Sequence, residues 1–223
     1  MRDSGDGDAL LVMIDLDNTL GNRTAAVQEW TEQFCTQRDL PAGAAEWILE
    51  QDNDGYSARS QVFAAIKKRF ELADPVEQIL EAYQSKIVQL AEPTMGAIEC
   101  LKDLRSAGHT VAIVSNGSTR QQHGKIDAMG LRPLVDAVIV SGDLDIKKPD
   151  ARIFEAAAAA TGQSLVGAWM VGDSALHDVV GARGVGAKTA WIHRGRAWSE
   201  PSCEPTVMID DLTQLADAIQ VGS

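Results

Sequence analysis

Short apolar runs recur along the chain and predict the strands of a sheet. The first, Leu10–Ile14, stops at an aspartate, and its unbroken hydrophobic character is typical of a strand buried on both faces. Similar runs follow later in the sequence, at 110–114, 137–140, 168–171, 187–192 and 206–209. We expect the last of these runs to lie at an edge of the sheet.

Helical patterns lie between these later runs. Ile98, Leu101 and Leu104 repeat at three-residue intervals. Gly108, a typical residue at a helix end, follows them. The alanine-rich stretch 151–161 and the stretch 212–219 also favour helices. Strands that alternate with helices predict parallel pairing through right-handed connections. We therefore expect an α/β fold, with a Rossmann-like parallel sheet flanked by helices.

The stretch between the first two predicted strands breaks this alternation. It contains no strand-like run, and turn-forming residues separate a series of helical patterns. These patterns cover 25–39, 42–51, 58–71 and 75–91. We predict an inserted all-helical domain at 21–92, and a core domain formed by residues 1–20 and 93–223.

Charge and composition narrow the class of protein. The 223 residues include 20 Lys and Arg against 32 Asp and Glu, a formal net charge of -12, which argues against nucleic-acid binding. An anionic substrate stays possible because a metal ion and a few lysines can reverse the local field. The polar first eight residues do not resemble a signal peptide, and no apolar run has membrane-spanning length. We expect a soluble cytoplasmic protein without a membrane partner, and leave monomer and homodimer both open.

Polar residues follow four of the predicted strands, at the sheet edge where open parallel sheets bind ligands. In chain order they are Asp15 and Asp17, Ser115 to Gly117, Lys147 and Lys148, and Asp173 with Asp178. Carboxylates that converge on one spot repel each other unless a cation joins them. Oxygen ligands at a phosphate site favour Mg²⁺. The sequence therefore predicts a cation site at this edge, with Mg²⁺ as the ion that would suit a phosphate ligand.

These groups resemble the four motifs of the haloacid dehalogenase superfamily. The motifs read Asp15-Leu-Asp17-Asn-Thr-Leu20, Ser115-Asn116-Gly117, Lys148-Pro149-Asp150, and Gly172-Asp173 with Asp178 five residues later. A lone Asp-x-Asp would be weak evidence, whereas four motifs in the right order over nearly the whole chain are specific. The proline places the motif lysine at Lys148, which leaves Lys147 as a solvated residue.

The resemblance implies a covalent mechanism. Asp15 would be the nucleophile that forms an aspartyl-phosphate, and Asp17 would protonate the leaving oxygen and then deprotonate water. Ser115 and the backbone N–H of Asn116, with Gly117 beside them, would hold the phosphoryl oxygens. Lys148 would neutralise charge on the phosphate and on the nucleophile.

The resemblance also implies a metal site and a cap domain. Asp15, the backbone carbonyl of Asp17 and Asp173 would bind Mg²⁺, and Asp178 would orient waters or Lys148 beside it. Asp178 is alternatively a first-turn helix residue that satisfies the helix dipole. The helical insert resembles a small helical cap that closes over the site and contacts the leaving group. The candidate cap contacts are Arg23, Trp30, Asp54, Tyr56 and Arg59.

The combined prediction is an Mg²⁺-dependent hydrolase of a small phosphorylated metabolite. Sugar phosphates, phosphoglycolate, nucleotides and biosynthetic intermediates all fit. The alternatives are a phosphomutase of the same fold and a non-catalytic, regulatory relative. A dehalogenase is disfavoured, because a leaving halide needs no proton and Asp17 would have no role.

Overall fold

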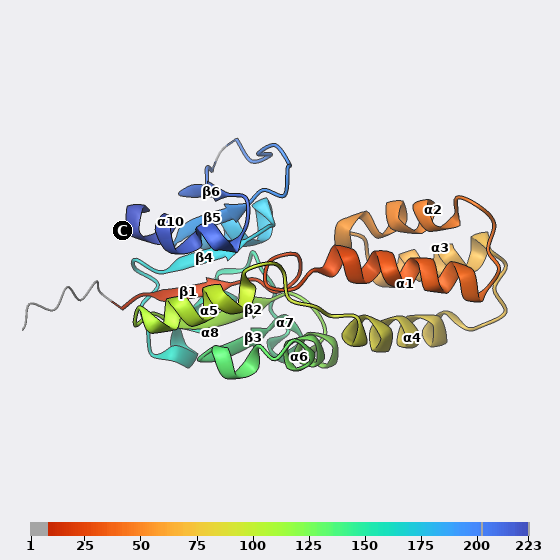
Figure 1. Cartoon of the computed structure of the whole chain (residues 1–223), viewed down its shortest axis with the longest axis horizontal. Coiled ribbons are helices and arrows are strands. Elements are labelled where there is room, and N and C mark those ends of the chain that lie inside the picture. Colours follow the sequence, from red (N-terminus) through yellow and green to blue (C-terminus); the bar gives the residue numbers. More distant parts are fainter. Residues whose placement is uncertain (1–8, 202, 223) are drawn as a thin grey trace, which may run out of the picture. The chain divides into compact units, whose positions relative to one another are not determined.

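The computed structural model describes residues 9–201 and 203–222. The expectation that no signal peptide is present concerns residues 1–8, which lie outside the described part. The chain forms two units (Figure 1): a sheet unit, Met1–Gly21 with Pro93–Ser223, and a helical unit, Asn22–Glu92. Among the helices that the structure describes, none is long and apolar enough to span a membrane.

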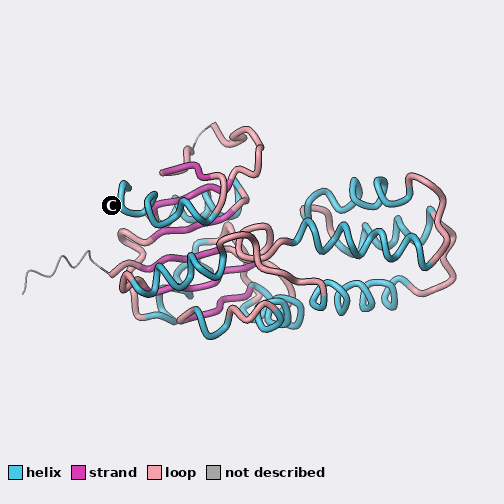
Figure 2. Tube along the Cα trace, in the orientation of Figure 1, coloured by secondary structure: helices cyan, strands magenta, loops and turns pink. Residues whose placement is uncertain are grey.

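The predicted sheet is present, with every pair of neighbouring strands parallel (Figure 2). Within the described residues its order is β3-β2-β1-β4-β5-β6. The strands are β1 (Leu11–Ile14), β2 (Thr110–Ser115), β3 (Ala137–Val140), β4 (Trp169–Gly172), β5 (Lys188–Ile192) and β6 (Val207–Ile209). The last strand lies at an edge, as predicted. The α/β, Rossmann-like fold class is therefore confirmed.

The order of the strands determines where a ligand can bind. Strand β1 pairs with β2 on one side and with β4 on the other, so that Val12 lies opposite both Val111 and Trp169. The chain runs from β1 to β2 and β3 on one side of β1 and then crosses to β4, β5 and β6 on the other, which opens a crevice at the carboxyl ends of the central strands. The side chains after β1, β2 and β4 are thereby brought together.

Helices connect the strands of the sheet unit. They are α5 (Ala97–Ser106), α6 (Thr119–Ala128), α7 (Ser141–Leu144), α8 (Ala151–Thr161), α9 (Gly181–Gly184) and α10 (Leu215–Gly222), with a π-helical turn at Ala175–Val180. The sequence pattern predicted α5, α8 and the closing helix. It did not predict α6, which carries two residues of the site described below.

Both faces of the sheet are buried. Leu11 and Met13 belong to a hydrophobic cluster that includes Phe154 of α8. Because side chains alternate along a strand, Val12 and Ile14 point to the opposite face, where they are equally inaccessible to solvent. Burial on both faces explains why the strands read as continuous apolar runs rather than as alternating patterns. It also fixes the strand ends, and with them the backbone positions of the site.

The helical unit contains α1 (Arg23–Gln37), α2 (Ala44–Asp52), α3 (Arg59–Arg69) and α4 (Val76–Gln89), close to the four helical patterns of the sequence. Its core is aromatic. Trp30 stacks on Phe34 with ring centroids 4.8 Å apart, and it meets Phe63 and Tyr83 edge-on. Trp30 was predicted as a possible substrate contact. Its ring instead fills the core of the helical unit, where it is 6% exposed.

Candidate active site

The centre of the site is a group of three buried carboxylates. Asp15 follows β1, whereas Asp173 and Asp178 follow the neighbouring strand β4. Each offers one oxygen to a common space, and these oxygens all lie within 4.8 Å of one another. An all-oxygen set of this kind suits Mg²⁺, which needs only a few carboxylates and keeps several waters. The predicted metal-ligating side chains are thus gathered in one place.

Lys148 lies inside this carboxylate group. Its side chain is buried, and its ammonium donates to Asp15 Oδ1 at 2.6 Å, to Asp178 Oδ1 at 2.7 Å and to the Val114 carbonyl at 2.7 Å. These three acceptors match the three hydrogens of an ammonium. Burial alone would lower the pKa of Lys148, but the two carboxylates outweigh it and raise that pKa above its ordinary value. Lys147 is exposed to solvent, as expected.

Asn116 positions the backbone of Lys148. The side-chain amide of Asn116 accepts from the Lys148 N–H at 2.8 Å and donates to the Lys148 carbonyl at 3.0 Å. This pair of bonds joins the end of β2 to the loop that follows α7. Asn116 was predicted only as a backbone donor to phosphate, so the sequence missed this structural role of its side chain.

Gly172 makes room for Asp178. Asp178 Oδ2 accepts from the Ser174 N–H at 2.9 Å, while its other oxygen binds Lys148. A Cβ atom on Gly172 would lie 2.1 Å from Asp178 Oδ2, closer than any two such atoms approach. The glycine is therefore a packing requirement for the carboxylate behind it. With both oxygens engaged inside the protein, Asp178 is better suited to hold Lys148 than to bind a metal ion directly.

The pKa of Asp15 is unusually high for an aspartate. Burial is the largest cause; Lys148 acts in the opposite direction, while Asp178 and Asp173 add repulsion, and together they raise the pKa of Asp15 to about 8. A further positive charge beside such a carboxyl favours its ionised form and lowers its pKa. The electrostatics of the group therefore favour the binding of a cation.

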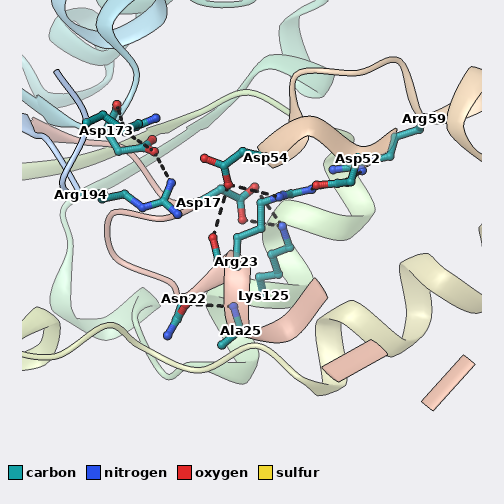
Figure 3. Close-up of polar contacts among 12 residues, drawn as sticks. Asp17, Asn22, Arg23, Ala25, Asp52, Asp54, Arg59, Lys125, Asp173 and Arg194 are labelled. Carbon is teal, nitrogen blue, oxygen red and sulfur yellow. Dashed lines mark hydrogen bonds and ion pairs between the residues drawn. The ribbon is translucent and has the colours of Figure 1, made fainter. Parts of the chain in front are cut away.

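Two arginines that the sequence did not single out contact Asp173. Asp173 Oδ2 accepts from Arg194 Nη1 at 2.9 Å and from Arg196 Nη2 at 3.0 Å, both from the loop after β5 (Figure 3 labels Asp173 and Arg194). The Asp173 carbonyl accepts from Trp191 Nε1 at 2.9 Å. Burial and Asp178 raise the pKa of Asp173 to about 6, although both arginines oppose this rise. No motif predicted these contacts, because an arginine in a loop after a strand has no distinctive spacing.

The second predicted aspartate, Asp17, has its own partners on α6. Its carboxylate accepts from Lys125 and from Gln122, and Gln122 Nε2 also donates to Ser115 Oγ at 2.7 Å. Ser115, at the end of β2, is buried. Gly117 follows it, and its N–H donates to Ser141 Oγ at 2.9 Å. The structure thus places Ser115 and Asp17 on one polar network.

Arg23, Arg59 and Asp54, three of the predicted cap contacts, belong to an ionic network of the helical unit that includes Asp52. Asp52 accepts from Arg23 Nη2 at 2.7 and 2.8 Å and also from Arg59 Nη1, and Figure 3 shows Asp52 between the two arginines. Burial would raise the pKa of Asp52, but the two arginines outweigh it and lower that pKa below its ordinary value. Tyr56 is 51% exposed. Asp52 was not predicted, since it read only as part of a turn.

Comparisons with known proteins agree with this architecture. A family model described as haloacid dehalogenase-like hydrolase matches residues 12–192. The chain is 36% identical over 121 residues to the phosphoserine phosphatase of Thermus thermophilus. This alignment covers 53% of this chain and 49% of that protein. It is 35% identical over 120 residues to the phosphoglycolate phosphatase of Caulobacter vibrioides, covering 54% and 50%. The chain thus spans about half the length of these curated relatives.

A solved structure resembles the whole chain. The magnesium-bound HAD-hydrolase YfnB of Bacillus subtilis superimposes with a TM-score of 0.79, covering 95% of this chain and 98% of that one. Sequence identity is 20%, so this likeness supports the fold alone.

The raised pKa of Asp15 predicts how stability depends on pH. In the metal-free protein, between about pH 4 and pH 8, the folded state holds a proton on Asp15 that the unfolded chain has released. Stability relative to Asp15→Asn should therefore fall as pH rises through this range, with a slope of at most about 1.4 kcal/mol per pH unit. Chemical denaturation in a chelator measures this difference, and Glu99→Gln, an exposed carboxyl on α5, is the control. A difference that stays flat or rises with pH would contradict the assignment.

Proposed function

The chain belongs to the haloacid dehalogenase-like hydrolase family, and we propose that it is a magnesium-dependent phosphohydrolase of small phosphate monoesters. One observation carries this proposal: Asp15 and Asp17 follow the same strand, yet each carboxylate has its own buried lysine. Lys148 contacts Asp15 at 2.6 Å, and Lys125 contacts Asp17 at 2.7 Å. Two carboxylates in separate environments suit two separate tasks, nucleophile and proton carrier.

The first step would form a bond between Asp15 and phosphorus. An oxygen of Asp15 attacks, the ester bond breaks, and Asp17 gives its proton to the leaving oxygen. Lys148 holds one Asp15 oxygen and balances negative charge as it moves onto the phosphoryl group. In the second step water attacks phosphorus and gives a proton to Asp17, while the bond between Asp15 and phosphorus breaks. Inorganic phosphate leaves, Asp15 is again a carboxylate, and Asp17 is again protonated.

We assign the phosphoryl oxygens to the end of β2. The proposed contacts are the Ser115 hydroxyl and the backbone N–H of Asn116, with Gly117 beside them at the carboxyl edge of the sheet. Ser115 is supported by its link to Asp17 through Gln122, because that link holds the phosphate end and the proton carrier in a fixed relation.

The proposed metal ligands are Asp15, the Asp17 carbonyl and Asp173. A bound Mg²⁺ would neutralise the phosphate and polarise the reacting phosphoryl group. Asp178 would act indirectly, by holding Lys148 in place. The nearby ion pairs support this proposal. Lys148 pairs with Asp15 and Asp178, and Asp173 pairs with Arg194 and Arg196. Three carboxylates therefore face three cations, and their charges balance when all six groups are ionised. Binding of a divalent cation would then give the site a net positive charge, which the negative charge of a phosphate dianion would match.

We further propose that Arg23, Tyr56 and Arg59 of the helical unit contact the leaving group. Arg23 and Arg59 both bind Asp52, and Arg23 Nη1 also lies 3.9 Å from Asp54 Oδ1. Guanidinium groups suit an ester that carries a second anionic group, such as the carboxylate of phosphoglycolate or a second phosphate.

Phosphate release from a panel of esters tests the proposed activity. The panel contains phosphoglycolate, phosphoserine, sugar phosphates and nucleotides, together with alkyl phosphates whose leaving groups are uncharged. We expect Mg²⁺-dependent turnover that EDTA stops, a preference for esters whose leaving group carries an anionic group, and at least about a thousandfold loss in Asp15→Asn. The exposed Asp103→Asn on α5 should match the wild type. Isomerised sugar phosphate with little free phosphate would favour a phosphomutase, and no turnover at all would favour a non-catalytic relative.

Calorimetric titration with Mg²⁺ tests the metal site without turnover. Asp173→Asn should weaken binding by about tenfold or more, since it removes a charged ligand. Arg194→Ala should strengthen binding, because this arginine occupies an oxygen of Asp173 and adds positive charge beside the ion. Arg183→Ala, an exposed arginine on α9, should leave binding unchanged. Equal affinities for all four proteins would contradict the proposed ligand set.

A further inference from the structure

Helix α6 supplies a cation that fits no motif of the sequence. Lys125 is buried, and its ammonium donates to Asp17 Oδ1 at 2.7 Å and to Oδ2 at 3.0 Å (Figure 3). A buried ammonium is costly unless an ionic partner compensates it. The Asp17 carboxylate is such a partner, and it remains 27% exposed on its other side. Lys125 therefore holds this carboxylate from within the protein while leaving it accessible.

Gln122 lies one helical turn before Lys125 and extends the same support. It is buried, and its Nε2 lies 3.0 Å from Asp17 Oδ2, 2.7 Å from Ser115 Oγ and 3.2 Å from the Asn116 carbonyl. Residues three apart on a helix share a face, so Gln122 and Lys125 reach the site together. One amide group thus connects the proposed phosphate contacts with Asp17.

Gly117 shows that this arrangement is built into the backbone. A Cβ atom on Gly117 would lie 2.7 Å from both Cγ and Cδ of Gln122. Its φ of 151° is also a conformation that favours glycine. The loop after β2 therefore passes Gln122 at a distance that suits glycine, and this packing together with the hydrogen bonds of Nε2 holds the glutamine in place.

We propose that Lys125 is a positioning residue for proton transfer by Asp17, with Gln122 as its support. The inference rests on the proposed phosphohydrolase function. Lys125 and Gln122 together fix the orientation of the carboxylate, which carries the proton to the leaving oxygen and later takes one from the attacking water. A carboxylate held in this way is already in the rotamer that proton transfer requires. General acid–base catalysis depends on such positioning within hydrogen-bond reach of the reacting oxygen.

Leaving groups of different basicity test this role. An aryl phosphate with a weakly basic leaving group, such as p-nitrophenyl phosphate, needs little protonation, whereas an alkyl phosphate needs it fully. The kcat/KM value reports the steps up to release of the alcohol. We expect Lys125→Met to lower kcat/KM by about a hundredfold on the alkyl ester and by less than about threefold on the aryl ester. Lys102→Met, an exposed lysine on α5, is the matched control.

A double-mutant cycle separates positioning from a general loss of structure. If Lys125 acts through Asp17, adding Lys125→Met to Asp17→Asn should cause almost no further loss on the aryl ester or the alkyl ester. Lys125→Gln, which retains a polar side chain, should recover part of the alkyl activity, and thermal unfolding confirms that each variant is folded. Equal losses on both esters, or full additivity in the cycle, would overturn the inference while leaving the proposed function intact. Absence of wild-type turnover on both esters would overturn the two together.

Discussion

The buried contact between Lys148 and the carboxylates of Asp15 and Asp178 is the interaction on which the site depends. It joins Asp15 after β1, Lys148 after α7 and Asp178 in the π-helical turn after β4, and two neighbouring residues constrain it further. Gly172 gives Asp178 its space, and the Asn116 amide holds the backbone of Lys148. A charge buried in this way is tolerated only with its partners, so loss of any member leaves the others uncompensated. The same contact keeps Asp15 oriented, which is what a nucleophile needs.

Charge also explains how the sheet unit can accept both a cation and an anion although the whole chain is acidic. Arg194 and Arg196 neutralise Asp173, and Lys125 neutralises Asp17, so the strand ends are close to balanced before any ligand binds. Burial, together with repulsion from Asp178 and Asp173, nevertheless raises the pKa of Asp15. A divalent cation removes the remaining repulsion and provides the positive charge that a phosphate group requires. Net charge, at -12, describes the surface and says little about this site.

Hydrophobic patterns predicted the sheet and most helices. The strands were recognisable because burial on both faces makes them continuous apolar runs, and the helices because their apolar residues recur at helical spacing. These patterns failed for α6, whose sequence from Thr119 to Ala128 is almost wholly polar and contains Gly124. The buried face of that helix is formed by Gln122, Lys125 and Ile126, so its inward residues do not register as hydrophobic. The motif resemblance located the four clusters, and the structure brings their residues together. The motif resemblance could not locate Lys125 or Arg194, since their partners are distant in sequence and only the fold brings them close.

The central claim is that Asp15 becomes phosphorylated, and trapping that species tests it most directly. In Asp17→Asn an aryl phosphate can still transfer its phosphoryl group, but hydrolysis of the intermediate lacks its base and should be slow. Rapid acid quenching followed by peptide mass spectrometry should then show a phosphoryl group on Asp15, formed together with about one equivalent of released aryl alcohol. Release of the alcohol with no phosphoryl group on the protein, or with the group on another residue, would contradict the account.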